Sequence, residues 1–238
     1  MSTTRSNGLI IAIDGPSGAG KSTLTSLLAR RLGYIHIDTG AMYRTLALVV
    51  SRAGIAVEDE PAVAALCAGV EIRFERTDGG YRVIANGEDV SGAIRTPEIS
   101  MLTSRIAAQR AVRELLLVLQ QRLGKDGGVI LEGRDIGTVV FPDAEVKFFL
   151  SATAQERGYR RFLELREKGD QVTLEDTVAA VVQRDEQDAV RELAPLRKAD
   201  DAVEIDSTGV TIEGVLSRME EIVRERVENS LPTTPSPS

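Results

Sequence analysis

The sequence has little of several residue types, and each shortage excludes a class of protein. A single cysteine, Cys67, excludes an internal disulfide and is typical of the reducing cytoplasm. The only histidine, His36, stands in the middle of a predicted strand, so we expect it to be structural. The apolar run near the start, LIIAI, is too short for a signal-peptide core or a membrane helix. We therefore predict a cytoplasmic protein that does not act at a membrane.

The chain is also short of lysine, although it is not short of positive charge. Only five of its 29 basic residues are lysine, and the rest are arginine. The planar guanidinium group matches phosphate and carboxylate in bidentate fashion. A genome rich in arginine codons would give the same excess, so position along the chain has to decide which arginines matter. The net charge of −7 argues against a broad nucleic-acid surface.

The rest of the composition predicts one globular α/β domain. With 238 residues, 42% hydrophobic and 27% charged, the chain is long enough for a sizeable core, and no long apolar stripe suggests more than a monomer. Strands are predicted at 8–14, 34–38, 128–133, 145–151 and 201–206, and helices at 21–33, 41–54, 97–108, 109–123, 153–168, 173–190 and 211–227. This order favours a parallel sheet flanked by helices. Residues 70–91 alternate around TDGG and predict a hairpin that interrupts the series.

The stretch GPSGAGKS, residues 15–22, fits the pattern G-x-x-x-x-G-K-[ST] and lies between a predicted strand and a predicted helix. The glycines of such a loop let backbone N–H groups turn inward around phosphate, and the following helix presents its positive end. Lys21 reaches the β and γ phosphates, and the Ser22 hydroxyl ligates Mg²⁺. The predicted ATP-binding residues are Gly15, Pro16, Ser17, Gly18, Ala19, Gly20, Lys21, Ser22 and Thr23.

Other motifs narrow the class of phosphate-loop protein. No N-K-x-D motif for guanine exists, and DVSG at 89–92 lies in the hairpin, where we take its match to D-x-x-G as chance. The strand end VILEG offers Glu132, which either orients a Mg²⁺-bound water or pairs with Lys21 or an arginine. The short loop, the inserted hairpin and an arginine-rich helical stretch favour a small-molecule kinase. Such an enzyme has to exclude water, and mobile flaps that close over both substrates do this.

Five segments in order then resemble the bacterial cytidylate kinases. They are DGPSGAGKST, DTGAMYR (38–44), EDVSGAIRTPEI (88–99), LEGRDIGTVVFPDA (131–144) and DSTGVTIEGV (206–215), and the resemblance runs from about residue 8 to 225. It implies an ATP- and Mg²⁺-dependent kinase of CMP or dCMP with the fold of the phosphate-loop nucleoside monophosphate kinases. It also implies a single domain over 8–227, a flap over about 40–125, a lid over about 153–172, and flexible tails at 1–7 and 228–238.

The same resemblance implies a set of acceptor-binding residues. They are Thr39, Tyr43, Arg44, Ser104, Arg113, Arg134, Asp135, Arg184, Asp188 and Arg191. By resemblance, Arg44, Arg134 and Arg191 bind the phosphate of CMP. Ser104, Arg113 and Asp135 read the base, and Arg184 with Asp188 holds the sugar. Arg95 matches a flap position that approaches the acceptor, and Gln187 stands where some relatives carry a further arginine.

The residues support part of this set by their own chemistry and leave part of it open. Arg134 and Asp135 directly follow a strand, and the carboxyl ends of parallel strands face the ligand crevice. Arg184, Asp188 and Arg191 share one helix face, which a solvent-exposed ladder of salt bridges would also produce. Ser104 and Arg113 would otherwise be ordinary helix-surface positions, and Tyr43 would otherwise be a packing residue.

The predicted lid contains ERGYRR, in which Arg157, Arg160 and Arg161 stand at i, i+3 and i+4. One helix face would then carry three guanidinium groups that repel one another when no anion is present. We predict that they contact phosphate rather than form a plain surface, and that one or more acts as an arginine finger. With Lys21 and Arg134 they form the predicted catalytic set.

Two alternative functions stay open from the residues alone. One is a kinase for a different small acceptor, such as a shikimate-like acid, against which the predicted base-reading set argues. The other is a regulatory protein that binds nucleotide without catalysis, against which Lys21, Ser22 and the arginine-rich lid argue.

Overall fold

The computed structural model describes residues 5–77 and 80–230. Its centre is a parallel five-stranded sheet, as predicted, in the order β2-β6-β1-β7-β8. The strands are β1 (Ile10–Asp14), β2 (Ile35–Asp38), β6 (Val129–Gly133), β7 (Val146–Ser151) and β8 (Val203–Asp206). β1 and β6 are buried along their whole length because helices cover both faces. Their register sets Asp14 beside Gly133, and Asp38 beside Glu132, so acidic side chains gather at the carboxyl edge.

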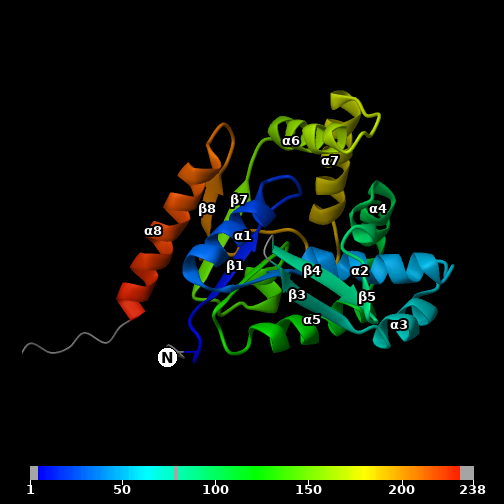
Figure 1. Cartoon of the computed structure of the whole chain (residues 1–238), viewed down its shortest axis with the longest axis horizontal. Helices are drawn as coiled ribbons and strands as arrows, with labels where there is room; N and C mark the ends of the chain where they lie inside the picture. Colours follow the sequence, from blue (N-terminus) through cyan, green and yellow to red (C-terminus); the bar gives the residue numbers. More distant parts are fainter. Residues whose placement is uncertain (1–4, 78–79, 231–238) are drawn as a thin grey trace, which may run out of the picture.

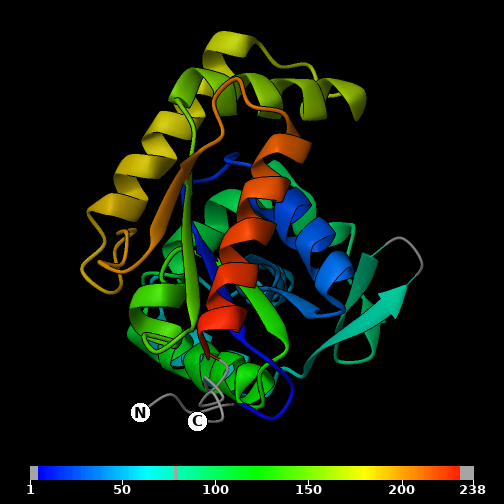
Figure 2. The same cartoon turned by 90° about the vertical axis from the view of Figure 1, so that its left-hand side faces the viewer.

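Two apolar clusters lie on opposite faces of the sheet, because successive side chains of a strand alternate. Ile11 and Ile13 of β1 belong to one cluster, with α1 (Lys21–Leu32) and α8 (Ile212–Ser230). Ile10 and Ala12 belong to the other, with α2 (Thr39–Arg52) and α5 (Arg110–Gly124). Figures 1 and 2 show these helices on either side of the strands. The sheet edge that carries the phosphate loop is therefore supported from both sides.

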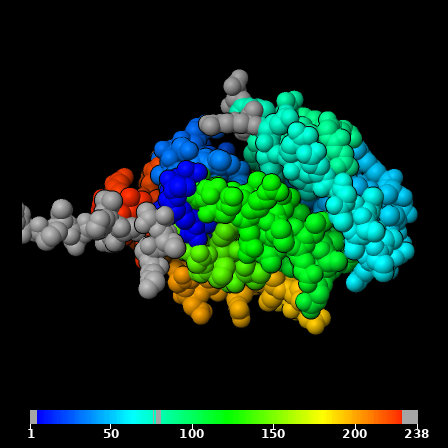
Figure 3. Space-filling view, turned by 90° about the horizontal axis from the view of Figure 1, so that it is seen from below, coloured from blue at the N-terminus to red at the C-terminus, as the bar shows by residue number. Residues whose placement is uncertain are grey.

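The segment between β2 and β6 contains a second, antiparallel sheet of three strands. Its elements are α3 (Glu60–Ala68), β3 (Ile72–Thr77), β4 (Gly80–Ala85), β5 (Glu88–Asp89), the short helix η1 (Ala93–Arg95) and α4 (Pro97–Ile106). Val83 and Ile94 of this insert share one apolar cluster with Leu131 of the central sheet. Figure 3 shows the insert, in cyan and teal, packed against the green surface that includes α5. The predicted hairpin is present, although its residues 78–79 lie outside the described part of the chain.

The lid region consists of α6 (Ala154–Glu167) and α7 (Leu174–Ala189), which pack closely on each other. Gly158 makes this possible, because a Cβ there would lie 2.4 Å from Val178 Cγ2. Both helices stand at the end of the molecule that is uppermost in Figures 1 and 2.

Three elements differ from the sequence predictions. The helix predicted from residue 41 begins at Thr39, because Asp38 caps it by accepting from the Ala41 N–H at 2.9 Å. The helix α3 was not predicted, since apolar residues fill most of its positions and leave little periodicity. A π-helical turn, η2 (Ile136–Val140), follows β6, and Arg134 and Asp135 lie between the two elements.

Both predicted tails are shorter than expected where the structure describes them. Arg5 forms ion pairs with Asp143 and Glu145, and the Asn7 N–H donates to the Asp126 carbonyl at 3.0 Å. At the other end α8 continues to Ser230, past the predicted boundary at 228. Residues 1–4 and 231–238 lie outside the description.

Candidate functional site

The phosphate loop follows β1 at the carboxyl edge of the sheet. Gly15, Gly18 and Gly20 have positive φ angles of 147°, 78° and 92°, which favour glycine. At Gly15 a Cβ would also lie 2.0 Å from the Leu150 carbonyl oxygen, so no other residue fits. The sequence motif therefore corresponds to a real constraint of the backbone.

Lys21 is buried under this loop, and the hydrogen bonds that it forms with the described residues go to the backbone. Its Nζ donates to the carbonyl oxygens of Gly15 and Pro16 at 2.7 and 2.6 Å. Burial, followed by the guanidinium group of Arg134, lowers the pKa of Lys21 well below its ordinary value. An anion in the loop would offset both effects, because it supplies the charge that the site lacks.

Ser22 and Glu132 meet beside the loop. The Ser22 hydroxyl donates to Glu132 Oε2 at 2.9 Å, and His36 Nε2 lies 2.9 Å from Glu132 Oε1. Within the described part of the chain, Glu132 forms no direct ion pair with Lys21 or an arginine, and the hydrogen-bond partners of its carboxylate are Ser22 and His36. His36 is thereby connected to the site, and nothing in the sequence around it signals this.

These oxygens suit the predicted magnesium ion. Across residues 5–77 and 80–230, no group of three or more His, Cys, Asp or Glu side chains could hold a metal by itself. Mg²⁺ is usually held by one or two protein oxygens together with substrate phosphates and water. One hydroxyl and one nearby carboxylate at the loop therefore fit such an ion.

Asp14 joins the loop strand to the turn after β6, and sequence reasoning missed it. Its carboxylate accepts from the N–H groups of Ile136 and Gly137 at 2.8 and 2.7 Å. Burial raises the pKa of Asp14 to about 6. Its partners Ile136 and Gly137 come directly after Asp135 of the predicted acceptor set but lie 122 and 123 residues from Asp14 in the chain, so spacing along the chain gave no signal.

Arg44 and Thr39 lie on the first turns of α2, close to the loop. Arg44 Nη2 donates to Asp38 Oδ2 at 2.8 Å, while its buried Nε has no hydrogen-bond partner among the described residues. The Thr39 hydroxyl donates to the Glu132 carbonyl oxygen at 2.7 Å. Arg44 is thus oriented by a carboxylate but retains donors for a ligand.

Asp188 lies between two predicted phosphate-binding arginines. Arg134 Nε donates to Asp188 Oδ2 at 2.9 Å, and Arg191 donates to Asp188 Oδ1. Burial by itself would raise the pKa of Asp188, but the charges of Arg134 and Arg191 lower it below its ordinary value. Arg184 and Asp188 lie on α7, but the helix ends at Ala189, so Arg191 follows it and does not share its face as predicted. Asp188 points inward rather than to solvent, because it is only 3% exposed.

Arg184, predicted for the sugar, lies against the donor loop. Its Nη1 is 3.4 Å from the Ser17 hydroxyl, and its buried Nε has no partner within the described residues. Burial, followed by Arg134, lowers its pKa to about 10. Arg184 therefore stands where the two predicted half-sites meet.

The predicted base-reading residues Arg113 and Asp135 form an ion pair. Arg113 also lies over the Tyr43 ring, 5.8 Å from its centroid, and burial raises the pKa of Tyr43 to about 12. Burial likewise raises the pKa of Asp135. All three line a hollow of about 160 Å³. Ser104 is half-buried on α4 and does not line this hollow within the described chain.

Gln120 lines the same hollow and was not predicted. Its side chain is 2% exposed, and its Nε2 has no hydrogen-bond partner in the described part of the chain. Gln120 stands seven residues after Arg113 on α5, so the two share a helix face. That spacing is the signal that could have identified it.

The prediction that the three lid arginines form a self-repelling face is wrong. They do not form an unpaired, self-repelling face, because Arg157 pairs with Asp185, Arg160 with Glu156 and Arg161 with Glu164. The first two also point to different places. Arg157 Nη1 donates to the Ser17 carbonyl oxygen at 3.1 Å, and Arg160 Nη2 donates to the Ser207 carbonyl oxygen at 2.8 Å.

Arg95 is exposed on η1, where its charge acts on Tyr81 of β4.

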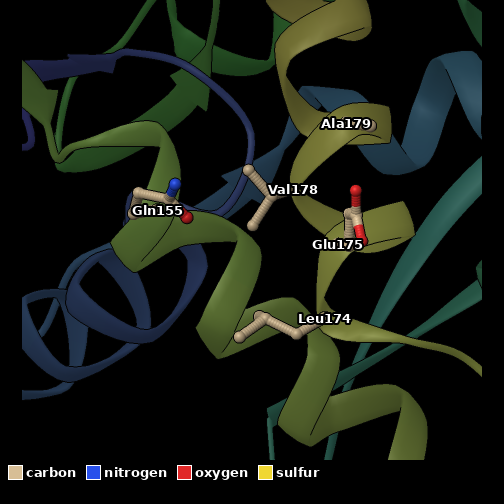
Figure 4. A pocket seen from close by; sticks show the side chains of 5 residues that line it. All are labelled: Gln155, Leu174, Glu175, Val178 and Ala179. Atoms are coloured by element: carbon tan, nitrogen blue, oxygen red, sulfur yellow. The ribbon is translucent and has the colours of Figure 1, made fainter.

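A larger hollow of about 520 Å³ lies between the lid helices (Figure 4). Its lining residues are Gln155, Leu174, Glu175, Val178 and Ala179. The lining is mainly apolar and contains no cation, and its one charged side chain is acidic. Such a lining does not suit a phosphate.

A glycine-rich loop with a buried lysine at the carboxyl edge of a parallel sheet, facing a set of paired arginines, defines a phosphate-loop phosphotransferase. The family model for cytidylate kinase matches residues 11–225, and the chain belongs to that family. A cytidylate kinase of Geobacter sulfurreducens is 67% identical over 226 residues, which cover 95% of this chain and 97% of that protein. The cytidylate kinase of Syntrophotalea carbinolica is 62% identical, covering 92% and 93%.

The fold also has a likeness among solved structures. An uncharacterized protein from Eubacterium ventriosum has a TM-score of 0.51 at 11% identity, covering 91% of this chain and 98% of that one. At that identity the likeness concerns the fold alone. Separately, none of the helices formed by the described residues has the length and apolar character needed to cross a membrane.

Proposed function

We propose that this chain transfers the γ-phosphoryl group of ATP to CMP or dCMP, which gives ADP and CDP or dCDP in pyrimidine nucleotide metabolism. One observation carries the proposal: a phosphate loop with Lys21 meets inward-facing arginines from separate segments at one sheet edge. The first half suits a triphosphate, and the second suits another substrate that carries a phosphate. Membership in the cytidylate kinase family supports cytidine as its nucleoside.

In the donor half, the loop from Gly15 to Thr23 wraps the phosphates of ATP. Lys21 exchanges the carbonyl oxygens that it now contacts for oxygens of the β and γ phosphates. Ser22 would hold Mg²⁺ directly and Glu132 would hold it through water. When bound, the ion neutralises charge on the triphosphate.

In the acceptor half, Arg44, Arg134 and Arg191 bind the phosphate of CMP, with Thr39 beside them. Each of these arginines has a carboxylate partner, Asp38 or Asp188, that fixes its direction before substrate arrives. Orienting the two phosphates toward each other is the main contribution that a protein makes to phosphoryl transfer. The attacking oxygen is already anionic near neutral pH, so the reaction needs no strong general base.

The base and the sugar are assigned to the remaining residues. Asp135 accepts from the exocyclic amino group of cytosine, where uracil presents an acceptor instead. Arg113 and Ser104 complete the base contacts, and Tyr43 packs beside Arg113. Arg184 and Asp188 hold the sugar, since a carboxylate accepts from its hydroxyl groups.

The lid supplies the last positive charges. Arg157, Arg160 and Arg161 are proposed to contact the phosphoryl group in transit when the lid closes, and the contact of Arg157 with Ser17 already connects the lid with the loop. We further propose that the chain works as a monomer. We also propose that it works in the cytoplasm, because a single cysteine that forms no internal disulfide suits a reducing compartment.

A panel of nucleoside monophosphates tested with ATP and Mg²⁺ examines the proposal. CMP and dCMP should give fast ADP release, while AMP, GMP and dTMP should give little. Preference for AMP, dTMP or UMP alone would overturn the assignment of the acceptor.

A further inference from the structure

Tyr81 connects the inserted hairpin to the predicted acceptor site. It lies on β4 of the insert, and its hydroxyl donates to Asp38 Oδ2 at 2.9 Å, on the central sheet. The same oxygen accepts from Arg44 Nη2 at 2.8 Å. Asp38 Oδ1 accepts from the Ala41 N–H at 2.9 Å. One carboxylate therefore holds a helix terminus, the hairpin and a predicted phosphate-binding arginine.

Aromatic contacts fix the direction of the Tyr81 ring. The ring contacts Phe74 on the paired strand β3 and His36 on β2 of the central sheet. Its centroid lies 5.4 Å from that of Phe74 and 5.2 Å from that of His36, and both contacts are edge-to-face. Such pairs favour one orientation of the ring. The hydroxyl is therefore aimed at Asp38 rather than free to turn to solvent.

Binding of an acceptor phosphate changes which groups stabilise the charge of the Asp38 carboxylate. Asp38 is only 5% exposed, so its negative charge depends on its protein partners. When Arg44 turns its donors toward a phosphate, the carboxylate loses part of its main charge partner. The Tyr81 hydroxyl and the Ala41 N–H are the groups that remain. Burial raises the pKa of Tyr81, so it stays a hydrogen-bond donor at every physiological pH.

We propose that Tyr81 is a positioning residue for the acceptor phosphate, acting through Asp38 on Arg44. Its hydroxyl keeps the buried Asp38 carboxylate satisfied, so that Arg44 can engage the phosphate of the acceptor. The inserted hairpin is by this contact part of the acceptor site, although Tyr81 does not touch substrate. The inference rests on the proposed function of Arg44.

Tyr81→Phe tests the inference, because it removes the hydroxyl and keeps the ring contacts. We expect the KM for CMP to rise about five- to ten-fold, while the KM for ATP changes less than about two-fold. Tyr34→Phe is the matched control. Its hydroxyl accepts from the Leu9 N–H at 3.0 Å, away from the acceptor residues, so both KM values should stay at those of the wild type.

A double-mutant cycle with Asp38→Asn shows whether the effect passes through Asp38. Tyr81→Phe should raise the KM for CMP much less in the Asp38→Asn background than in the wild type. An equal rise in both backgrounds, or an equal rise in the two KM values of Tyr81→Phe, would overturn the inference. Absence of CMP turnover in the wild type would instead contradict the proposed function, so the two failures are distinguishable.

Discussion

The two halves of the candidate site are built in different ways. The donor half is the loop from Gly15 to Thr23, whose shape depends on glycines with positive φ and on backbone N–H groups. The acceptor half consists of side chains from α2, α5, the turn after β6 and the end of α7. Four of its arginines, Arg44, Arg113, Arg134 and Arg191, are already paired with Asp38, Asp135 or Asp188.

Because of this difference, the two halves bind the phosphate groups of their substrates in different ways. A backbone cradle has no other partner for its inward N–H groups, so an anion satisfies them directly. A paired arginine has to share or exchange a carboxylate when substrate binds, so only the difference between two sets of contacts appears as affinity. In return, the carboxylates hold the arginines in fixed directions before binding. We therefore expect the acceptor half to be the part that distinguishes substrates.

Removing the donor half alone should have the largest effect. Lys21→Ala should lower kcat about 10³-fold or more, because the charge on the phosphoryl group in transit loses its partner. Binding of CMP, measured by calorimetry without ATP, should stay within about two-fold. Lys125→Ala, an exposed lysine, is the control for loss of charge. Retained turnover in Lys21→Ala would refute the role of the loop.

Weakening the acceptor half should raise the KM for CMP, whereas the change in the donor half lowers kcat and leaves CMP binding intact. Asp188→Asn removes the charge that orients Arg134 and Arg191, and the KM for CMP should rise about 10- to 100-fold, with the KM for ATP nearly unchanged. Asp176→Asn, an exposed position in the first turn of the same helix, should leave both values unchanged. Equal effects of Asp188→Asn on both substrates would show that the halves are not separate.

Asp14 lies where the halves join. Its titration should change the free energy of unfolding as the pH changes. Its pKa is about 6 in the folded chain against 3.8 ordinarily, so the folded state holds a proton that the unfolded state has lost in this window. The contribution of the neutral carboxyl is complete below the lower value and is lost as pH rises through the upper one.

Asp14→Asn, which does not titrate, isolates this contribution. Between pH 7.5 and pH 5, the free energy of unfolding of the wild type should rise by about 1 kcal/mol relative to the variant, measured by urea unfolding. Asp200→Asn, at an exposed position, should change in parallel with the wild type. A constant difference between wild type and Asp14→Asn at both pH values would show that Asp14 does not titrate with a raised pKa.

The smallest expected effect concerns Gln120, which tests how far the acceptor half extends along α5. Gln120 faces the hollow beside Arg113, and its Nε2 has no hydrogen-bond partner among the described residues, so Gln120→Met should be nearly neutral for stability and should raise the KM for CMP about three-fold. Gln121→Met is the control, because the Gln121 side chain is exposed and donates to the Val140 carbonyl oxygen at 3.1 Å, and it should have no such effect. A large loss of stability in Gln120→Met would show that the amide has a structural role instead.

The sequence predicts the donor half better than the acceptor half for a physical reason. The loop, its strand and its helix are contiguous, so one motif contains the whole constraint. The strands, most helices and the parallel sheet also follow from local periodicity. The partners of Arg134 and Asp14 are more than 50 residues away in the chain, and only the folded sheet brings them together. The carboxylate partners of Arg160 and Arg161 stand four and three residues away, and this spacing could have shown that the lid face is not self-repelling.

The most direct test of the central claim follows the labelled phosphoryl group itself. ATP that carries ³²P in the γ position is incubated with the protein, Mg²⁺ and CMP, and the products are separated. The account predicts label in CDP, with little in inorganic phosphate while CMP is present. Label that goes mainly to inorganic phosphate, or that stays in ATP, would contradict the claim that donor and acceptor halves form one phosphoryl-transfer site.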